Sequence, residues 1–259
     1  MRYSRCSSQE LPNLSQFWSQ VQSQACGCPD PLISDLYAVN ICDHSDFPSA
    51  LASLLGAKLA DRSITESTLT RLVAKCIEED ISIAGAACED ILATYERDPA
   101  CTDLVTPFLF FKGWQALQAY RISHFLWKRD RRPLAYHFQS RINERFGIDI
   151  HPAAQIGKGL TIDHGTAIVI GETCIIGNNV SLFQGVTLGG TGKSEGERHP
   201  VIRESVMIGA GAKILGRLEV GAHARIGAAS VVLEDIPPYA TAVGNPARIV
   251  RVDTPGSGD

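Results

Sequence analysis

The sequence lacks the features that mark membrane, secreted and nucleic-acid-binding proteins. It has no run of about 18 consecutive apolar residues, which a bilayer-spanning helix needs. Its formal net charge is only −4, so it does not carry the strongly basic surface that binds phosphate backbones. The opening stretch MRYSRCSSQE contains no apolar signal core. We therefore expect a cytoplasmic protein whose partners are neither membranes nor nucleic acids.

Cysteine is present, but its spacing is not typical of a metal site or a disulfide framework. Cys26 and Cys28 are separated by a single residue, and no second pair of His or Cys completes a zinc pattern. Cys76 and Cys88 fall on apolar helical faces, where a thiol usually packs as a small hydrophobic group. We therefore predict free thiols in a reducing compartment and no bound metal. The cysteines are Cys6, Cys26, Cys28, Cys42, Cys76, Cys88, Cys101 and Cys174.

The first half of the chain has the period of helices. Residues 1–48 carry few signals and contain the breaker sequence GCPDP, so we expect a lead-in that is partly mobile and partly helical. Apolar residues then recur at helical spacing as far as Phe146, and Gly147 is placed to end the last helix. The sequence thus predicts an all-α domain over 49–147. Its helices are expected in three runs between 49 and 97, in one long run of about 104–129, and over about 132–146.

The second half has a period of six, which neither a helix nor an ordinary strand produces. The clearest series is Ile208, Ile214, Val220, Ile226 and Val232. A short fixed repeat indicates a coiled chain whose successive turns stack, each covering the apolar face of the turn before it. We place this coil at 148–250 and expect the tail, 251–259, to be disordered.

The repeat is interrupted between Leu188 and Ile202. The intervening segment, 189–201, contains four glycines and four fixed charges, so it cannot fill a core face. It is predicted to project as a loop, and long loops on rigid scaffolds often carry function.

Asp-His pairs also interrupt the repeat. Asp149 and His164 are fifteen residues apart, close to one turn of the coil if a turn takes about three repeats, so they are predicted to lie on adjacent turns within reach of each other. A carboxylate that orients a histidine would let the imidazole take a proton from a hydroxyl group. The alternative, a solvent-facing histidine and a corner aspartate, stays open at this point.

Several motifs together resemble the serine O-acetyltransferase family. They include the helical stretch 98–127 and, in the coil, DIHPAAQIGKGLTIDHGTAIVIGET (149–173), VTLGGTGK (186–193), RHP (198–200), IGAGAKILG (208–216) and VGNPAR (243–248). The resemblance covers roughly residues 80–250. It is more specific than the six-residue repeat, which many unrelated acyltransferases share.

This resemblance implies an α+β fold, in which an N-terminal all-α helical domain is followed by a left-handed parallel β-helix of hexapeptide repeats. It implies homotrimers, usually paired into hexamers through the helical domains, with the active site between neighbouring subunits. The implied reaction moves the acetyl group of acetyl-CoA directly to the hydroxyl of L-serine, which gives O-acetyl-L-serine for cysteine biosynthesis. Acetyl-CoA is then a co-substrate, and no tightly bound cofactor is implied.

The resemblance also assigns site residues. His164 matches the general base and Asp149 its orienting partner. Residues implied to bind serine are Asp98 and Asp163 at its amino group, Arg198 at its carboxylate, and His199 from the facing subunit. Residues implied to line the acetyl-CoA groove are Gly190, Thr191, Ala210, Gly211 and Ala228.

Two other functions were weighed. A hexapeptide-repeat acetyltransferase with a different acceptor would share the coil, but such enzymes generally lack the helical domain and the full set of polar motifs. A γ-class carbonic anhydrase on the same coil would need three converging histidines, and the spacing of His151, His164 and His199 does not match that family. The family's partner, O-acetylserine sulfhydrylase, binds a terminal isoleucine, so the ending Gly258-Asp259 disfavours that complex.

Overall fold

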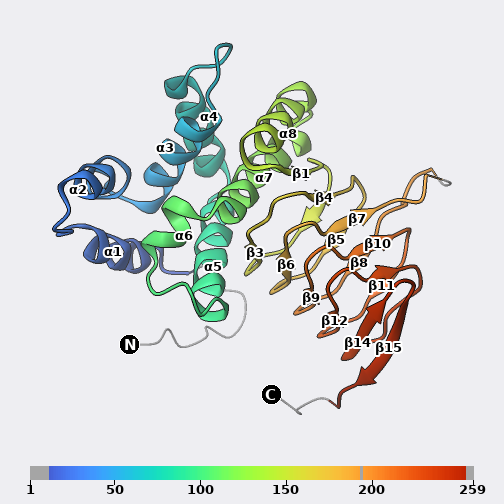
Figure 1. Cartoon of the computed structure of the whole chain (residues 1–259). Coiled ribbons are helices and arrows are strands. Elements are labelled where there is room, and N and C mark those ends of the chain that lie inside the picture. Colours follow the sequence, from blue (N-terminus) through green and yellow to red (C-terminus); the bar gives the residue numbers. More distant parts are fainter. Residues whose placement is uncertain (1–11, 193–194, 255–259) are drawn as a thin grey trace.

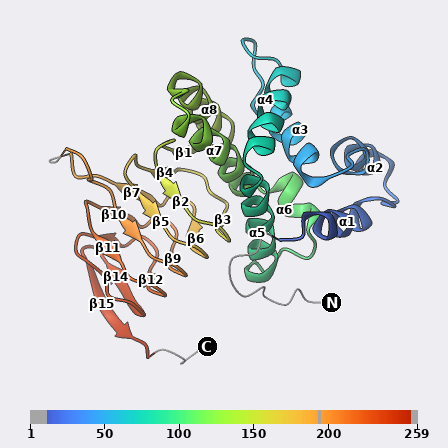
Figure 2. The ribbon, with the colours of Figure 1, turned by 180° about the vertical axis from the view of Figure 1, so that it is seen from behind.

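The computed structural model describes residues 12–192 and 195–254. A bundle of helices lies at one end, and a coil of short strands extends away from it (Figure 1). Seen from the opposite side, α7 and α8 adjoin the first strands of the coil (Figure 2). None of the helices in the described ranges has the length and apolarity needed to cross a membrane. The predicted order, helical region and then parallel β-helix, is confirmed.

The helical region contains eight α-helices and a short π-helix, η1, within the described residues. Gln115 explains why the long helix predicted over 104–129 is wrong. Its side-chain amide donates to the carbonyl oxygens of Phe108 (3.2 Å) and Leu109 (2.7 Å), which ends α6 and leaves Phe111 extended. The elements are α1 Leu14–Ala25, α2 Pro31–Tyr37, η1 Ala38–Cys42, α3 Phe47–Leu59, α4 Glu66–Glu79, α5 Ser82–Arg97, α6 Val105–Phe110, α7 Lys112–Lys128 and α8 Arg132–Phe146.

The lead-in belongs to the same hydrophobic core as the later helices. Phe17 of α1 meets Phe47 of α3 edge to face, with ring centroids 5.0 Å apart. Trp18 packs on Phe108 of α6 at 5.8 Å. The core of the helical region therefore does not divide at residue 48.

A disulfide between Cys26 and Cys42 contradicts the prediction that all cysteines are free. Cys26 follows α1 and Cys42 ends η1, and their Cα atoms lie 6.1 Å apart. Hydrogen bonds from Trp18 and Gln22 to the carbonyl of His44 hold the two segments together. This proximity depends on tertiary packing, which the spacing of the cysteines does not reveal. The other described cysteines, Cys28, Cys76, Cys88, Cys101 and Cys174, are free thiols.

Reduction of this bridge is expected to lower the free energy of unfolding by about 3 kcal/mol, because the bridge closes a loop of roughly fifteen residues in the unfolded chain. Urea unfolding with and without a phosphine reductant measures the difference. The double variant Cys26→Ser/Cys42→Ser is the control, since the reductant should not change its stability. Equal stability of the oxidised and reduced wild type would contradict the expectation.

The coil is a three-sided parallel β-helix. Face A contains β1, β4, β7, β10 and β13; face B contains β2, β5, β8 and β11; face C contains β3, β6, β9, β12, β14 and β15. All pairs are parallel except β14 with β15. The strands are β1 Ile148–Ile150, β2 Gln155–Ile156, β3 Thr161–Asp163, β4 Ile168–Ile170, β5 Ile175–Ile176, β6 Ser181–Phe183, β7 Thr187–Gly189, β8 Val201–Ile202, β9 Met207–Ile208, β10 Lys213–Leu215, β11 Glu219–Val220, β12 Arg225–Ile226, β13 Val231–Val232, β14 Ala240–Gly244 and β15 Ala247–Val252.

The six-residue repeat corresponds to inward-facing aliphatic side chains. On face A, the strand register stacks Ile150, Ile170, Leu188, Ile214 and Val232 in one buried column. Each turn therefore covers the apolar side chain of the turn before it, as the repeat predicts.

Three edges join the faces. The C–A edge contains 164–167, 184–186, 209–212 and 227–230, and the A–B edge contains 151–154, 171–174, 190–192, 195–200 and 216–218. The B–C edge contains 157–160, 177–180, 203–206 and 221–224. The described residues of the loop predicted at 189–201 thus leave the coil at the A–B edge and return to it there.

The end of the coil differs from the predicted disordered tail, 251–259. Arg251 and Val252 belong to β15, which pairs antiparallel with β14 and extends face C. The backbone of β14 forms the hydrogen bonds that hold β15 in place, and the sequence alone does not show this pairing. Residues 255–259 of that predicted tail lie outside the described ranges.

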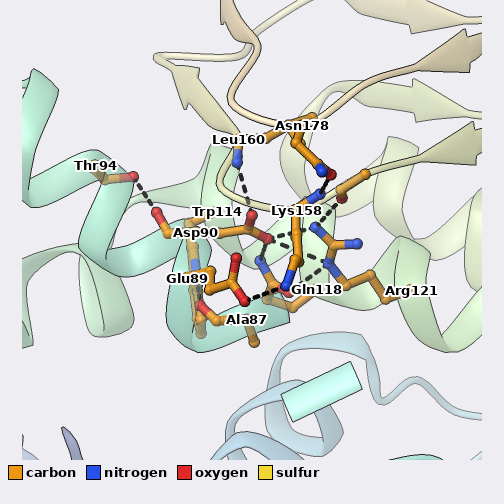
Figure 3. A network of polar contacts seen from close by, with 11 residues as sticks. Ala87, Glu89, Asp90, Thr94, Trp114, Gln118, Arg121, Lys158, Leu160 and Asn178 are labelled. Atoms are coloured by element: carbon orange, nitrogen blue, oxygen red, sulfur yellow. Dashed lines mark hydrogen bonds and ion pairs between the residues drawn. The ribbon is translucent and has the colours of Figure 1, made fainter. Parts of the chain in front are cut away.

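A buried polar network joins the helical region to the first turn of the coil (Figure 3). Asp90 of α5 is fully buried, and its Oδ2 accepts hydrogen bonds from Arg121 (2.7 Å) and Gln118 (3.0 Å) of α7. Its Oδ1 accepts the backbone N–H of Leu160, while Arg121 also donates to the carbonyl of Gly157. Helices α5 and α7 are thereby fixed to the B–C edge. This contact orients the helices relative to the faces that carry the candidate site.

Candidate active site

A cluster of polar side chains on the A–B edge combines two turns of the coil. Arg198 donates from Nη2 to Oε2 of Glu172 at 2.7 Å. Thr173 Oγ1 accepts the backbone N–H groups of Arg198 (3.0 Å) and His199 (3.1 Å). These bonds fold the end of the loop back against the preceding turn and fix the positions of both loop residues.

The ring of His199 is held in one orientation. The backbone N–H of Thr173 donates to Nδ1 of His199 at 3.2 Å, so a neutral His199 carries its proton on Nε2. On the other side of the ring, a Cβ at Gly171 would lie 2.0 Å from Cδ2 of His199. Only glycine at position 171 leaves room for the imidazole.

The charges of this cluster shift two of its ionisable groups. The hydrogen bond from Arg198 lowers the pKa of Glu172 below its usual range, so the ion pair is present at neutral pH. Burial lowers the pKa of His199, and the Arg198 charge adds to that effect. His199 is therefore a neutral imidazole near pH 7.

Asp149 projects from the outer side of face A, between Ile148 and Ile150, which face the core. Its Oδ1 accepts a hydrogen bond from Nε2 of Gln139 on α8 at 2.7 Å. The neighbouring His151 has its pKa lowered by burial, while the carboxylates of Glu172 and Asp149 oppose that shift. Asp149 thus contributes to the same electrostatic environment as the A–B cluster.

His164 lies at the C–A edge, on the other flank of face A from the A–B cluster, and Asp163 is the last residue of β3 on face C. His164 has a φ of 55° and a side chain 72 % exposed, with Nε2 3.7 Å from Oδ1 of Asp163. Because it packs against little of its own chain, this imidazole is accessible to a substrate or to another chain.

Small residues continue along the C–A edge below His164. Backbone hydrogen bonds of 2.8 Å link successive corners: Gly185 N–H to Thr166, Gly211 N–H to Gln184, and Ala229 N–H to Ala210. The predicted acetyl-CoA residues Ala210 and Gly211 take part in these bonds, and Ala228 precedes Ala229 at the same edge. Small side chains at these positions allow an extended ligand to approach the backbone closely.

The remaining predicted residues, Gly190, Thr191 and Asp98, lie in the loop of the A–B edge and at the end of α5. Gly190 is beside the A–B cluster, since a Cβ there would lie 3.5 Å from Nε2 of His199, and Thr191 follows it in the exposed loop. Asp98 ends α5 and accepts the backbone N–H of Ala100 at 2.8 Å. Its neighbour Arg97 donates to Asn179 on the B–C edge. Asp98 therefore lies at the end of a helix, α5, that contacts β3, the strand that ends at Asp163.

The predicted pairing of Asp149 with His164 does not form within the chain. No hydrogen bond or ion pair joins them among residues 12–192 and 195–254. A full turn takes twenty residues here, so Asp149 stacks on Val169, while His164 belongs to the corner that precedes that strand. The structure instead places His164, Ala210, Gly211 and Ala228 on the C–A edge, and Gly190, Thr191, Arg198 and His199 on the A–B edge. Asp149 lies on face A, Asp163 in β3 of face C, and Asp98 after α5.

Three contributors were missed by sequence reasoning: Glu172, Thr173 and Gln139. Glu172 and Thr173 occur in the family-like stretch 149–173, and the repeat length would have placed them next to the loop. Gln139 contacts Asp149 only because α8 packs on β1, and no local pattern signals that contact. No group of three or more His, Cys, Asp or Glu side chains able to hold a metal occurs in the part of the chain that the structure describes.

Comparisons with known proteins identify the relatives of this chain. Residues 17–119 match the family model described as serine acetyltransferase, N-terminal. A serine acetyltransferase of Escherichia coli strain K12 is 50% identical over 236 residues, which cover 90% of this chain and 86% of the relative. The solved soybean serine acetyltransferase complexed with serine is 45% identical with a TM-score of 0.89, covering 92% of this chain and 100% of that one. A solved serine acetyltransferase in complex with CoA is 46% identical with a TM-score of 0.87, covering 91% and 99%.

Identity at this level extends over both the helical region and the coil, and the solved relatives share the whole architecture. The chain therefore belongs to the serine acetyltransferase family, and it is an acyltransferase.

Proposed function

We propose that the protein transfers the acetyl group of acetyl-CoA to the hydroxyl of L-serine, giving O-acetyl-L-serine and CoA, as the first step of cysteine biosynthesis. Two observations on relatives support the substrates, since solved serine acetyltransferases are complexed with serine and with CoA. The site residues of this chain supply the remaining support, because they include a histidine for the hydroxyl proton and an arginine for a carboxylate.

The observation that carries the proposal is the division of the site between two edges. His164 with the ladder of small residues lies on the C–A edge, and Arg198 with His199 lies on the A–B edge. Within a single chain these two groups of residues lie on different edges of the coil, so they cannot both contact one substrate molecule. If the C–A edge of one protomer meets the A–B edge of the next, a heterologous contact repeated three times closes a ring with three complete sites. We therefore propose a homotrimer, with two trimers pairing through their helices.

In this arrangement, His164 of one protomer takes the proton from the serine hydroxyl as the oxygen attacks the thioester carbonyl. Asp149 of the neighbouring protomer orients that imidazole and stabilises the imidazolium. When the tetrahedral intermediate collapses, the C–S bond breaks and the imidazolium returns its proton to the CoA sulfur. No acyl-enzyme is required, because the hydroxyl oxygen attacks the carbonyl carbon directly.

The binding residues take roles that fit their chemistry. Arg198 receives the serine carboxylate in a planar fork, where the carboxylate replaces or joins Glu172, and His199 lies beside it. The carboxylates of Asp163 and Asp98 hold the serine ammonium group. The extended arm of acetyl-CoA lies between Ala210, Gly211 and Ala228 of one protomer and Gly190 and Thr191 of the other.

A thiol-release assay with acetyl-CoA and a panel of hydroxyl acceptors tests the activity. L-Serine should give the highest kcat/KM among L-serine, D-serine, L-threonine, L-homoserine and simple sugars. A clearly higher value for another acceptor would show a different acetyltransferase on the same coil.

Mixed trimers test whether the catalytic pair forms between protomers. The variants Asp149→Ala and His164→Ala should each be inactive alone, but coexpression with different tags should restore activity. In randomly mixed rings about a quarter of the interfaces combine an intact His164 with an intact Asp149. Coexpression of two differently tagged His164→Ala chains is the control and should stay inactive. Absence of recovery in isolated mixed trimers would place both residues of the pair in one chain.

A further inference from the structure

We propose that Gln139 is a positioning residue for acetyl transfer, which holds one oxygen of Asp149 so that the other faces the catalytic histidine of the neighbouring protomer. This inference rests on the proposed function, because it requires Asp149 to orient His164. Gln139 touches no substrate in the proposed arrangement, and it acts only through the carboxylate.

The contact joins two elements whose relative position is fixed. Nε2 of Gln139 donates to Oδ1 of Asp149 at 2.7 Å. Gln139 lies two turns before the end of α8, and Gly147 turns the chain from α8 into β1 with a φ of 68°. The neighbouring helix residues Phe138 and Ile142 are buried, so α8 cannot rotate about its axis without disturbing the core. Gln139 therefore presents its amide to Asp149 from a rigid support.

The hydrogen bond leaves half of the carboxylate available. Within the described ranges, Oδ1 accepts from Gln139, and no donor of the same chain is bonded to Oδ2. A carboxylate that orients a histidine needs one oxygen directed at the imidazole N–H and a second contact that prevents rotation about its Cβ–Cγ bond. Gln139 provides that second contact.

A neutral donor suits this task better than a cation. An amide fixes the carboxylate but leaves its negative charge intact, so Asp149 still stabilises the imidazolium when it forms. Lysine or arginine in place of Gln139 would compete for that charge. Charged or titratable groups on the elements around this pair include His151 directly after β1, Glu172 and Arg198 on the A–B edge, and Lys213 in the same outward column of face A as Asp149.

The first test removes the donor and keeps the shape. Gln139→Leu should lower kcat about tenfold, which is the loss expected for one hydrogen bond to a charged group. KM for serine and acetyl-CoA should stay within about twofold, because Gln139 touches neither substrate. The matched control is Asn143→Leu, one turn further along α8 with an exposed side chain, which should leave kcat unchanged. Wild-type kcat in Gln139→Leu would overturn the inference.

The second test uses a donor that titrates. In Gln139→Glu, two carboxyl groups face each other at hydrogen-bond distance and share one proton. The pair loses this proton at a higher pH than an isolated carboxyl group does, because its loss leaves two negative charges side by side. While the pair is protonated, the new carboxyl group at position 139 still donates a hydrogen bond to Asp149. Deprotonation removes that donor. The ratio of variant to wild-type kcat/KM should therefore be highest at low pH and fall as the pH rises. A structural role alone would give a pH-independent ratio, as Gln139→Leu should, and a flat ratio for Gln139→Glu would contradict the proposal.

The third test separates this inference from the proposed function. In an Asp149→Ala background, Gln139→Leu should cause no further loss of kcat, because the carboxylate that it positions is gone. A tenfold further loss there would overturn the positioning role. If Asp149→Ala itself retained normal kcat, the proposed catalytic pair would fail, whereas a large loss in Asp149→Ala with none in Gln139→Leu would reject Gln139 alone.

Discussion

Replacing His164 with alanine is expected to lower kcat for acetyl transfer by between about 10²- and 10⁴-fold, the range typical of a lost general base. A serine hydroxyl is a weak nucleophile at neutral pH, and without an adjacent base its proton has no acceptor in the site. The side chain of His164 is 72 % exposed, so its removal leaves no buried cavity and should not alter folding or assembly.

His223→Ala is the matched control for this variant. His223 also has a positive φ, 62°, and it also lies at a corner of the coil, but on the B–C edge, where it stacks on Tyr239. Its replacement should leave kcat within about twofold of wild type. Steady-state kinetics, thermal unfolding and size-exclusion chromatography of both variants measure the difference. A His164→Ala enzyme with near-normal turnover and normal assembly would remove His164 as the base.

Replacing Asp90 with alanine is expected to destabilise the protein by about 3–5 kcal/mol, because it leaves a buried guanidinium without its partner. Arg121 is only 9 % exposed and cannot recover its hydration by a small movement. The backbone N–H of Leu160 and the amide of Gln118 lose an acceptor in the same change. The loss should appear as a lower urea midpoint with the slope of the transition unchanged.

Glu89→Ala provides the comparison for Asp90→Ala. Glu89 is the next residue of α5 and forms an ion pair with Lys158 at 2.8 Å, but both side chains of that pair are partly exposed. An exposed pair contributes about 0–1 kcal/mol, so this variant should unfold near the wild-type midpoint. Equal effects of the two variants, or a loss below about 1 kcal/mol in Asp90→Ala, would show that the buried network does not fix the helices to the coil.

The fold was largely predictable because its strongest signals are local. Inward-facing aliphatic residues recur about every six residues along the chain, and each member of a column such as Ile150 to Val232 needs only the turn before it to be covered. Gly147 also ends α8 in the left-handed conformation that glycine favours. The break at Phe111 could not be predicted, because it depends on the side chain of Gln115 satisfying carbonyl groups of the preceding turn.

The candidate site was predictable by residue type but not by arrangement. Asp149, His164 and Arg198 interrupt a repeat that otherwise selects aliphatic or small residues, so they stand out in the sequence. Their neighbours are determined by tertiary contacts: Glu172 reaches Arg198 across one turn, and Gln139 reaches Asp149 from a helix. The disulfide between Cys26 and Cys42 escaped prediction for the same reason, since the packing of α1 on η1 brings the sulfurs together.

The missing side chain at Gly171 also bears on how tightly a substrate is held. Because the imidazole of His199 packs directly over that glycine and is bonded to Thr173 at its far nitrogen, the ring has lost its rotational freedom before any ligand arrives. Ordering a flexible side chain on binding usually costs about 0.5–1.5 kcal/mol of affinity. At this corner the side chain of His199 is already ordered when the protein folds, so ligand binding does not incur that entropic cost. Gly171 therefore contributes to recognition by preorganising His199 and not by adding a contact.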